Sequence, residues 1–145
     1  MKKLRWHKQE TEYSCLPACL KSVLEYYGIL ETEGALRIRC KSKAVSTHPL
    51  NAVECARSYG LESYLDNLNV DELRNLLKAN IPPIINLLMF ESEPQALHSV
   101  ILTSITKKHV KVINPESGFV MIPLHEFLHI WNAADQTAIV IKKPS

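Results

Sequence analysis

The feature that most limits what this chain can fold into is a change in hydrophobic periodicity near its middle. In the first half, apolar residues recur at helical spacing, and glycine or small polar residues mark where each helical stretch begins and ends. In the second half, short segments rich in Val and Ile alternate with turn sequences such as NPESG. Helices followed by strands predict an α+β fold, in which an N-terminal helical half packs on a C-terminal antiparallel sheet.

Start and stop signals place the individual elements. Pro17 stands in the first turn of the first predicted helix and Gly28 ends it, while Asn69 and Glu72 form a capping box at the start of the last helix of this half. The first half is expected to be mainly helical, with helices at 17–27, 33–40, 49–59 and 69–80. The second half is expected to contain strands at 82–89, 97–105, 109–115, 119–123 and 136–143, with a short helix at 124–131.

Length and composition restrict the class of protein. A chain of 145 residues with 46% hydrophobic content can bury one sizeable core, and no repeat or flexible linker divides it, so residues 1–145 are expected to form a single domain. The net charge of +2, without a long basic run, argues against nucleic acid as a partner. No segment is apolar and long enough for export or membrane insertion, and the four cysteines are expected to be reduced thiols, so a cytoplasmic protein is predicted.

One cysteine lies at an unusual place. Cys15, in QETEYSCLPAC, falls at a loop-to-helix boundary, where backbone N–H groups at a helix start favour negative charge. A thiol becomes a strong nucleophile only as a thiolate, which a helix N-terminus, a nearby imidazole or both can stabilise. Cys15 is therefore predicted to be a nucleophile, although an ordinary packed cysteine is the alternative.

The partners that such a nucleophile needs are present elsewhere in the chain. His98 interrupts an apolar strand at its start and is the expected general base and acid. A hairpin through the turn at 106–108 would bring Asn114 back beside His98, where its amide can orient the imidazole. Gln9, six residues before Cys15, can donate its amide N–H to a developing oxyanion. Each of these three also has a plain structural interpretation, as a core histidine, a turn residue and a surface amide.

A zinc site is an alternative use of some of these side chains. Cys15 and Cys19 are four residues apart, as are His125 and His129, so the two pairs could in principle form a Cys2His2 set. Structural zinc sites usually hold their cysteines in a tight knuckle loop, which is not what this spacing gives. The expected site therefore contains no metal and no cofactor.

The order of these motifs resembles the papain-like cysteine peptidases that cleave double-glycine leader peptides, often found as the N-terminal domain of peptide-exporting ABC transporters. The matching features run from Gln9 to Trp131: Gln9 before SCLPAC, then EYYG, the Leu-Arg pair, HSVIL, INPESG and HEFLHIW. The resemblance implies a papain-like fold, proteolysis after a Gly-Gly or Gly-Ala pair, and the same roles for Cys15, His98, Asn114 and Gln9.

The chain departs from that family pattern in three ways. Ser14 and Leu16 stand where the family usually has Asp and Gly around the nucleophile, and Asn114 replaces the usual Asp. A bulky Leu16 is expected to narrow or reshape the cleft, and an uncharged Asn114 to lower activity. No transporter follows Ser145, which leaves open a transporter recruited in trans or another substrate. Two rivals stay open: a non-catalytic peptide-binding or partner-binding domain of the same fold, and an amidase, deamidase or transglutaminase-like enzyme.

Overall fold

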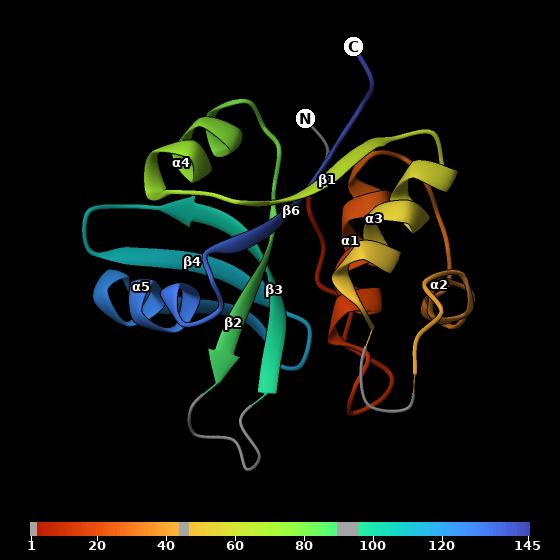
Figure 1. Ribbon diagram of the computed structural model, residues 1–145, viewed down its shortest axis with the longest axis horizontal. Helices are drawn as coiled ribbons and strands as arrows, with labels where there is room; N and C mark the ends of the chain where they lie inside the picture. Colours follow the sequence, from red (N-terminus) through yellow and green to blue (C-terminus); the bar gives the residue numbers. More distant parts are fainter. Residues whose placement is uncertain (1–2, 44–46, 90–95) are drawn as a thin grey trace.

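The computed structural model describes residues 3–43, 47–89 and 96–145 (Figure 1). Within these ranges the chain forms five helices and six strands. The helices are α1 (Cys15–Tyr26), α2 (Glu33–Arg39), α3 (Pro49–Ser58), α4 (Val70–Lys78) and α5 (Leu124–Asn132). The strands are β1 (Glu62–Asn67), β2 (Ile84–Met89), β3 (Ala96–Ile105), β4 (His109–Asn114), β5 (Gly118–Pro123) and β6 (Thr137–Lys142).

The six strands form one antiparallel sheet in the order β1-β6-β2-β3-β4-β5. Strands β2 to β5 follow one another in both the sequence and the sheet. The last strand, β6, enters between β1 and β2 and so ties the C-terminus to the middle of the chain. The α+β prediction and the antiparallel pairing are confirmed.

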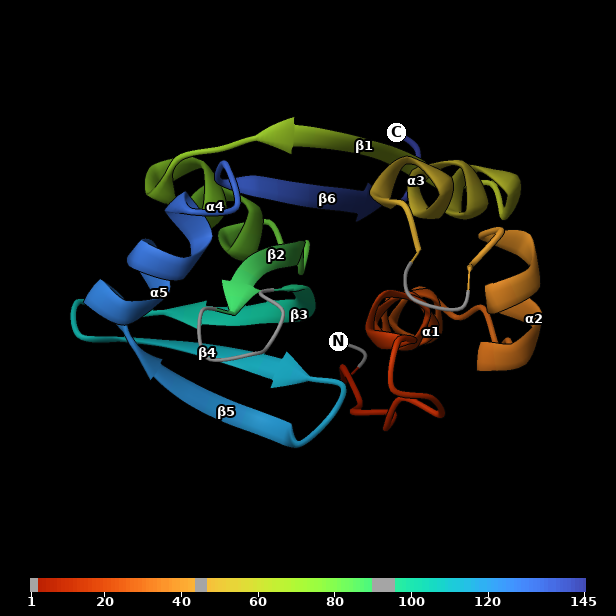
Figure 2. The same cartoon turned by 60° about the horizontal axis from the view of Figure 1, so that its bottom comes forward.

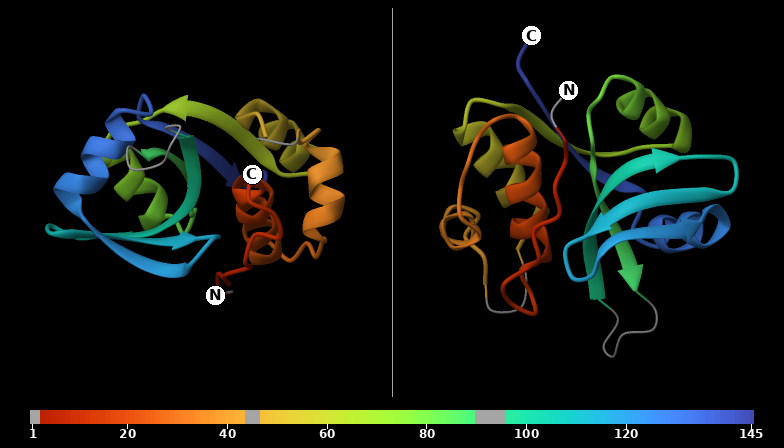
Figure 3. Two further views of the ribbon diagram at one scale, coloured as in Figure 1. Left: turned by 90° about the horizontal axis from the view of Figure 1, so that it is seen from below. Right: turned by 180° about the vertical axis from the view of Figure 1, so that it is seen from behind.

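The helices divide between two sides of the molecule. Helices α1, α2 and α3 gather beside the sheet at the end where β1 and β6 reach them, and α4 and α5 lie against the sheet itself (Figures 2 and 3). Helix α1 contacts β3, α3 contacts β1, and α5 contacts β2. Helix α1 therefore lies next to the strand that carries His98.

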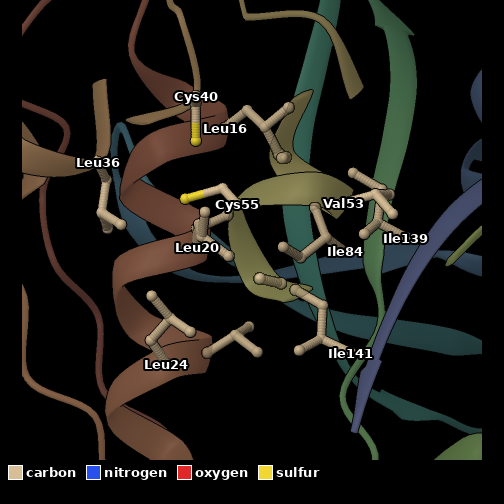
Figure 4. Packing of buried hydrophobic residues seen from close by; sticks show 14 of the residues in the cluster. Leu16, Leu20, Leu24, Leu36, Cys40, Val53, Cys55, Ile84, Ile139 and Ile141 are labelled. Carbon is tan, nitrogen blue, oxygen red and sulfur yellow. The ribbon is translucent and has the colours of Figure 1, made fainter. Parts of the chain in front are cut away.

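Two buried apolar clusters hold these layers together. The first joins α1, α2 and α3 to the sheet through residues that include Leu20, Leu24 and Ile139 (Figure 4). The second fills the opposite face of the sheet beneath α5, with Phe127 and Trp131 stacked at its centre. Cys40 and Cys55 belong to the first cluster, as expected for packed small hydrophobes, and none of the four cysteines is in a disulfide.

The predicted capping box of α4 is present in the structure, but one strand is absent from the prediction. The side chains of Asn69 and Glu72 form the capping box of α4, and the ring of His48 accepts the N–H of Leu50 at the start of α3. However, residues 62–67 form β1, so the first half is not wholly helical. This strand pairs along its whole length with β6, from Glu62 opposite Lys142 to Asn67 opposite Thr137.

Candidate active site

Cys15 is the first residue of α1, so the helix begins at the thiol itself rather than just after it. Its N-cap residue, Ser14, makes no side-chain hydrogen bond to the helix start. The N-terminal N–H groups of a helix point outward and favour negative charge. Cys15 is half-buried, whereas Cys19, Cys40 and Cys55 are buried.

The surroundings of Cys15 favour its thiolate. Burial acts to raise the pKa of this thiol, but a hydrogen bond and the charge of His98, with hydrogen bonds from Ser99, outweigh burial and lower the pKa. The pKa of His98 moves the opposite way: burial acts to lower it, and hydrogen bonds to Cys15 and Asn114 together with the charges of Cys15 and Glu116 raise it. Shifts in these two directions favour the charged forms of both groups, a thiolate beside an imidazolium.

The β3–β4 hairpin brings Asn114 beside His98, as the sequence predicts. Ile101 pairs with Ile113 in this hairpin, and the turn closes with the N–H of Thr106 donating to the carbonyl of His109. The Nε2 atom of His98 lies 2.7 Å from the Oδ1 atom of Asn114. Two residues that are sixteen apart in sequence therefore meet in space.

The direction of this hydrogen bond fixes the tautomer of the imidazole. Asn114 Oδ1 also accepts the backbone N–H of Glu116 at 3.0 Å, and because a backbone N–H can only donate, this atom must be the amide oxygen. The Nε2 atom of His98 therefore carries the proton that it donates to Asn114. The other ring nitrogen, Nδ1, is left to exchange a proton with Cys15.

Gln9 lies in the loop that leads to Cys15, and its side chain is engaged within that loop. Its Nε2 donates to the carbonyl oxygens of Thr11 at 2.8 Å and Glu12 at 3.2 Å. Its Oε1 is buried and has no hydrogen-bond partner among the described residues. Its backbone N–H donates to the carbonyl of Pro115, one residue beyond Asn114. Hydrogen bonds thus connect Gln9 both to the loop before Cys15 and to Pro115, beside Asn114. The amide of Gln9 can donate to an oxyanion only if it gives up one of its two bonds to loop carbonyls.

The predicted effect of Leu16 on the cleft is wrong. Leu16 is only 3% exposed and belongs to the first apolar cluster, where Figure 4 shows it among side chains that include Cys40 and Cys55. A side chain at the second helical position points into the core here, and it does not project over the sulfur. The bulk of Leu16 therefore gives no reason to regard the site as blocked.

The described residues do not assemble a metal site. Cys15 and Cys19 lie on α1, whereas His125 and His129 lie on α5, which packs under the other part of the sheet (Figure 2). Across residues 3–43, 47–89 and 96–145, no group of three or more His, Cys, Asp or Glu side chains is placed to hold a metal ion. Cys19 is instead fully buried, with its Sγ 3.4 Å from the carbonyl of Ser99, and burial raises its pKa well above the ordinary value.

Two features of the site carry no obvious mark in the sequence. The backbone N–H of Ser99 hydrogen-bonds the Cys15 sulfur, and the Ser99 hydroxyl donates to Asn86 Oδ1 at 3.0 Å. Asn86 is the single polar residue inside the apolar strand β2, and that interruption is the signal that would have pointed to it. Trp6 donates its indole N–H to the carbonyl oxygen of Pro115 at 3.1 Å, and its ring lies against Gly118. These contacts stabilise the turn after Asn114.

Taken together, the geometry supplies a thiol of lowered pKa, an imidazole beside it and an amide that orients the imidazole. This is the set of groups that nucleophilic acyl transfer requires.

None of the helices in the described part of the chain is both long and apolar enough to cross a membrane.

Comparisons with known proteins find a family match over nearly the whole chain. The model of the peptidase C39 family matches residues 3–145. Among curated proteins, none matches the sequence.

Several solved structures share the fold across nearly the whole chain. One is a double glycine motif protease from an AMS/PCAT transporter, solved in complex with its leader peptide, with a TM-score of 0.81, 25% identity, and coverage of 98% of this chain and 93% of that one. The peptidase domain of Streptococcus ComA, a bifunctional ABC transporter of a quorum-sensing pathway, gives a TM-score of 0.81 at 20% identity, covering 98% and 100%. A C39-like peptidase from Bacillus anthracis gives 0.82 at 16% identity, covering 99% and 96%.

Proposed function

Because the chain belongs to the peptidase C39 family, we propose that it is a cysteine peptidase in which Cys15 is the nucleophile and His98 the general base and acid. Asn114 orients the imidazole, and Gln9 with the backbone N–H of Cys15 stabilises the oxyanion. The observation that carries this assignment is the chain of contacts from Cys15 to His98 to Asn114, which ends at 2.7 Å between His98 Nε2 and Asn114 Oδ1.

The first half of the reaction breaks the peptide bond. The thiolate of Cys15 attacks the carbonyl carbon, a carbon–sulfur bond forms, and the carbonyl π electrons move to the oxygen. The oxyanion is then stabilised by N–H donors at the start of α1 and by the Gln9 amide. As the oxyanion collapses, the carbon–nitrogen bond breaks, and the protonated His98 gives its Nδ1 proton to the leaving amine.

The second half releases the acyl group. His98, now neutral, takes a proton from water, and the hydroxide attacks the thioester carbonyl. The carbon–sulfur bond breaks and the N-terminal product leaves as a carboxylic acid. Cys15 returns to the thiolate and His98 to the imidazolium, which the hydrogen bond to Asn114 continues to orient.

The proposed substrate is a leader peptide with Gly-Gly or Gly-Ala before the cut. Support comes from the fold shared with the double glycine motif protease that was solved with a leader peptide. A cleft fitted to glycine would exclude larger side chains by sterics. The proposed setting is the cytoplasm, together with a peptide-exporting ABC transporter, since two of the similar structures are parts of transporters, one of them an ABC transporter.

The test is cleavage of a synthetic peptide. The purified chain is incubated with a peptide that carries a Gly-Gly pair near its middle and, in parallel, with one in which both glycines are replaced by valine. Mass spectrometry is expected to find cleavage after the second glycine of the first peptide only, and none with Cys15→Ala. Equal cleavage by the Cys15→Ala variant would remove the thiolate from the mechanism. Ammonia release from a glutamine-containing protein, with no peptide cut, would favour an amidase instead.

A further inference from the structure

Glu33, the first residue of α2, is a buried carboxylate that the proposed mechanism does not use. Only 1% of the residue is exposed, and a charged side chain is almost never buried without partners. Its partners all belong to the loop before Cys15 or to α2 itself. The carboxylate therefore connects the second helix to the segment that leads into the nucleophile.

The contacts of Glu33 fasten both ends of the 10–14 loop. Its Oε1 accepts the backbone N–H of Glu10 at 2.9 Å and lies 3.2 Å from the hydroxyl of Ser14. Its Oε2 lies 3.2 Å from Nε of Arg37, one turn along α2. Arg37 in turn pairs through Nη2 with the carboxylate of Glu10 at 3.0 Å. The loop is thus held at its first residue and at its last, the one directly before Cys15.

Ser14 shows what this connection does at the start of α1. Although Ser14 is the N-cap residue, its hydroxyl makes no bond to the helix; it accepts the N–H of Thr11 at 3.0 Å and lies within 3.2 Å of both the Thr11 carbonyl and Glu33. An N-cap serine ordinarily binds the N–H groups of the first turn. With its hydroxyl turned toward Glu33, that turn keeps its N–H groups free of a side-chain cap.

We propose that Glu33 is a positioning residue for the nucleophile: by holding Glu10 and Ser14 it fixes the first residue of α1, so that the sulfur meets His98 and the first turn stays uncapped. Glu33 touches neither the sulfur nor the imidazole in this role. Displacement of a reacting group by about 1 Å can lower a rate by up to about two orders of magnitude, so a small shift of this loop is enough to matter.

The test is the pH dependence of Cys15 alkylation, which needs no peptide substrate. Iodoacetamide modification of Cys15 is followed by mass spectrometry at pH 6 and at pH 9.5 in wild type and in Glu33→Asp, which keeps the charge but withdraws it by one methylene. The variant is expected to react at least about five-fold more slowly at pH 6, where reactivity depends on His98, and within about two-fold of wild type at pH 9.5, where an unpaired thiol is also ionised. Equal rates at both pH values would overturn the proposal.

Two controls separate position from charge and from stability. Glu33→Gln keeps the acceptor oxygen that faces Glu10 and Ser14 but loses the ion pair with Arg37, so it is expected to slow alkylation at pH 6 less than Glu33→Asp does and to stay within about two-fold of wild type at pH 9.5. A slowing as large as that of Glu33→Asp would mean that charge is what counts, and the positioning role would be wrong. Leu73→Ala, in the buried face of α4, lowers stability away from the site and is expected to leave the pH 6 rate unchanged. If Leu73→Ala slows alkylation at pH 6 as much as Glu33→Asp does, the effect of Glu33→Asp comes from lower stability and the proposal is wrong.

A second variant covers the case in which Glu33→Asp does not fold. Ser14→Ala removes the hydroxyl that faces Glu33 and is expected to slow alkylation at pH 6 by about three-fold; an unchanged rate contradicts the proposal. The claim that Glu33 matters for peptide cleavage rests on the proposed function, whereas the claim that Glu33 positions Cys15 does not. If wild type reacts fast at pH 6 but cleaves no peptide, the peptidase proposal fails while the Glu33 result still stands or falls on the alkylation data.

Discussion

Replacing Asn114 with alanine tests the orientation of the imidazole most sharply. The substitution removes the 2.7 Å hydrogen bond and leaves Nε2–H of His98, a half-buried group, without a protein acceptor. Loss of one partner of a buried hydrogen bond costs about 1–3 kcal/mol, and because His98 keeps some access to water we take the lower part, about 1–2 kcal/mol. That corresponds to a fall in kcat/KM of roughly 5-fold to 30-fold.

The pH profile should change in a defined direction. The bond to Asn114 helps to raise the pKa of His98, so its loss lowers that pKa, and the alkaline limb of kcat/KM moves to lower pH. The assay is cleavage of the Gly-Gly peptide at closely spaced pH values. Asn114→Asp is the matched control, since a carboxylate still accepts both hydrogen bonds and also attracts imidazolium; its alkaline limb should move to higher pH. An Asn114→Ala enzyme within two-fold of wild type, with an unmoved limb, would refute the reasoning.

Three further outcomes follow from the same contacts. In wild type, kcat/KM should fall on the acid side as the Cys15 thiolate gains a proton and on the alkaline side as the His98 imidazolium loses one, because catalysis needs both charged forms; a single limb in the measured profile would contradict this. Leu16→Ala should lower the free energy of unfolding by about 2–4 kcal/mol in a denaturant titration, because the side chain is in the core, and a change under about 0.5 kcal/mol would place it at the surface. Gln9→Ala should lower kcat by about 10²-fold, a larger loss than in the alkylation rate of Cys15, and an unaltered kcat would exclude an oxyanion role.

The parts of the fold that the sequence predicts are those set by local chemistry. The capping box at Asn69 and the hairpin at 106–108 depend on residues a few positions apart, and both form as expected. The meeting of His98 with Asn114 follows from the same hairpin. Local signals were sufficient there because antiparallel neighbours joined by a short turn have few alternative registers.

The parts that the sequence did not reveal depend on distant partners. Strand β1 has mainly exposed, polar side chains and becomes a strand by pairing with β6 near the C-terminus, which no local pattern indicates. Leu16 and Glu33 were misjudged or overlooked for a related reason. A leucine beside a nucleophile suggests a cleft and a glutamate at a helix start suggests solvent, yet Leu16 is buried in the first apolar cluster and Glu33 is buried against the loop before Cys15.

The central claim is that His98 holds Cys15 as a thiolate, and the ultraviolet absorbance of that thiolate measures it directly. The pH titration of wild type, corrected by the titration of Cys15→Ala, should show a thiolate that forms below the ordinary pKa of 9.0, and His98→Ala should raise the pKa of Cys15 because burial is then opposed only by the hydrogen bonds from Ser99. A Cys15 that titrates near 9.0 in wild type, or that is unaffected by His98→Ala, would contradict the account.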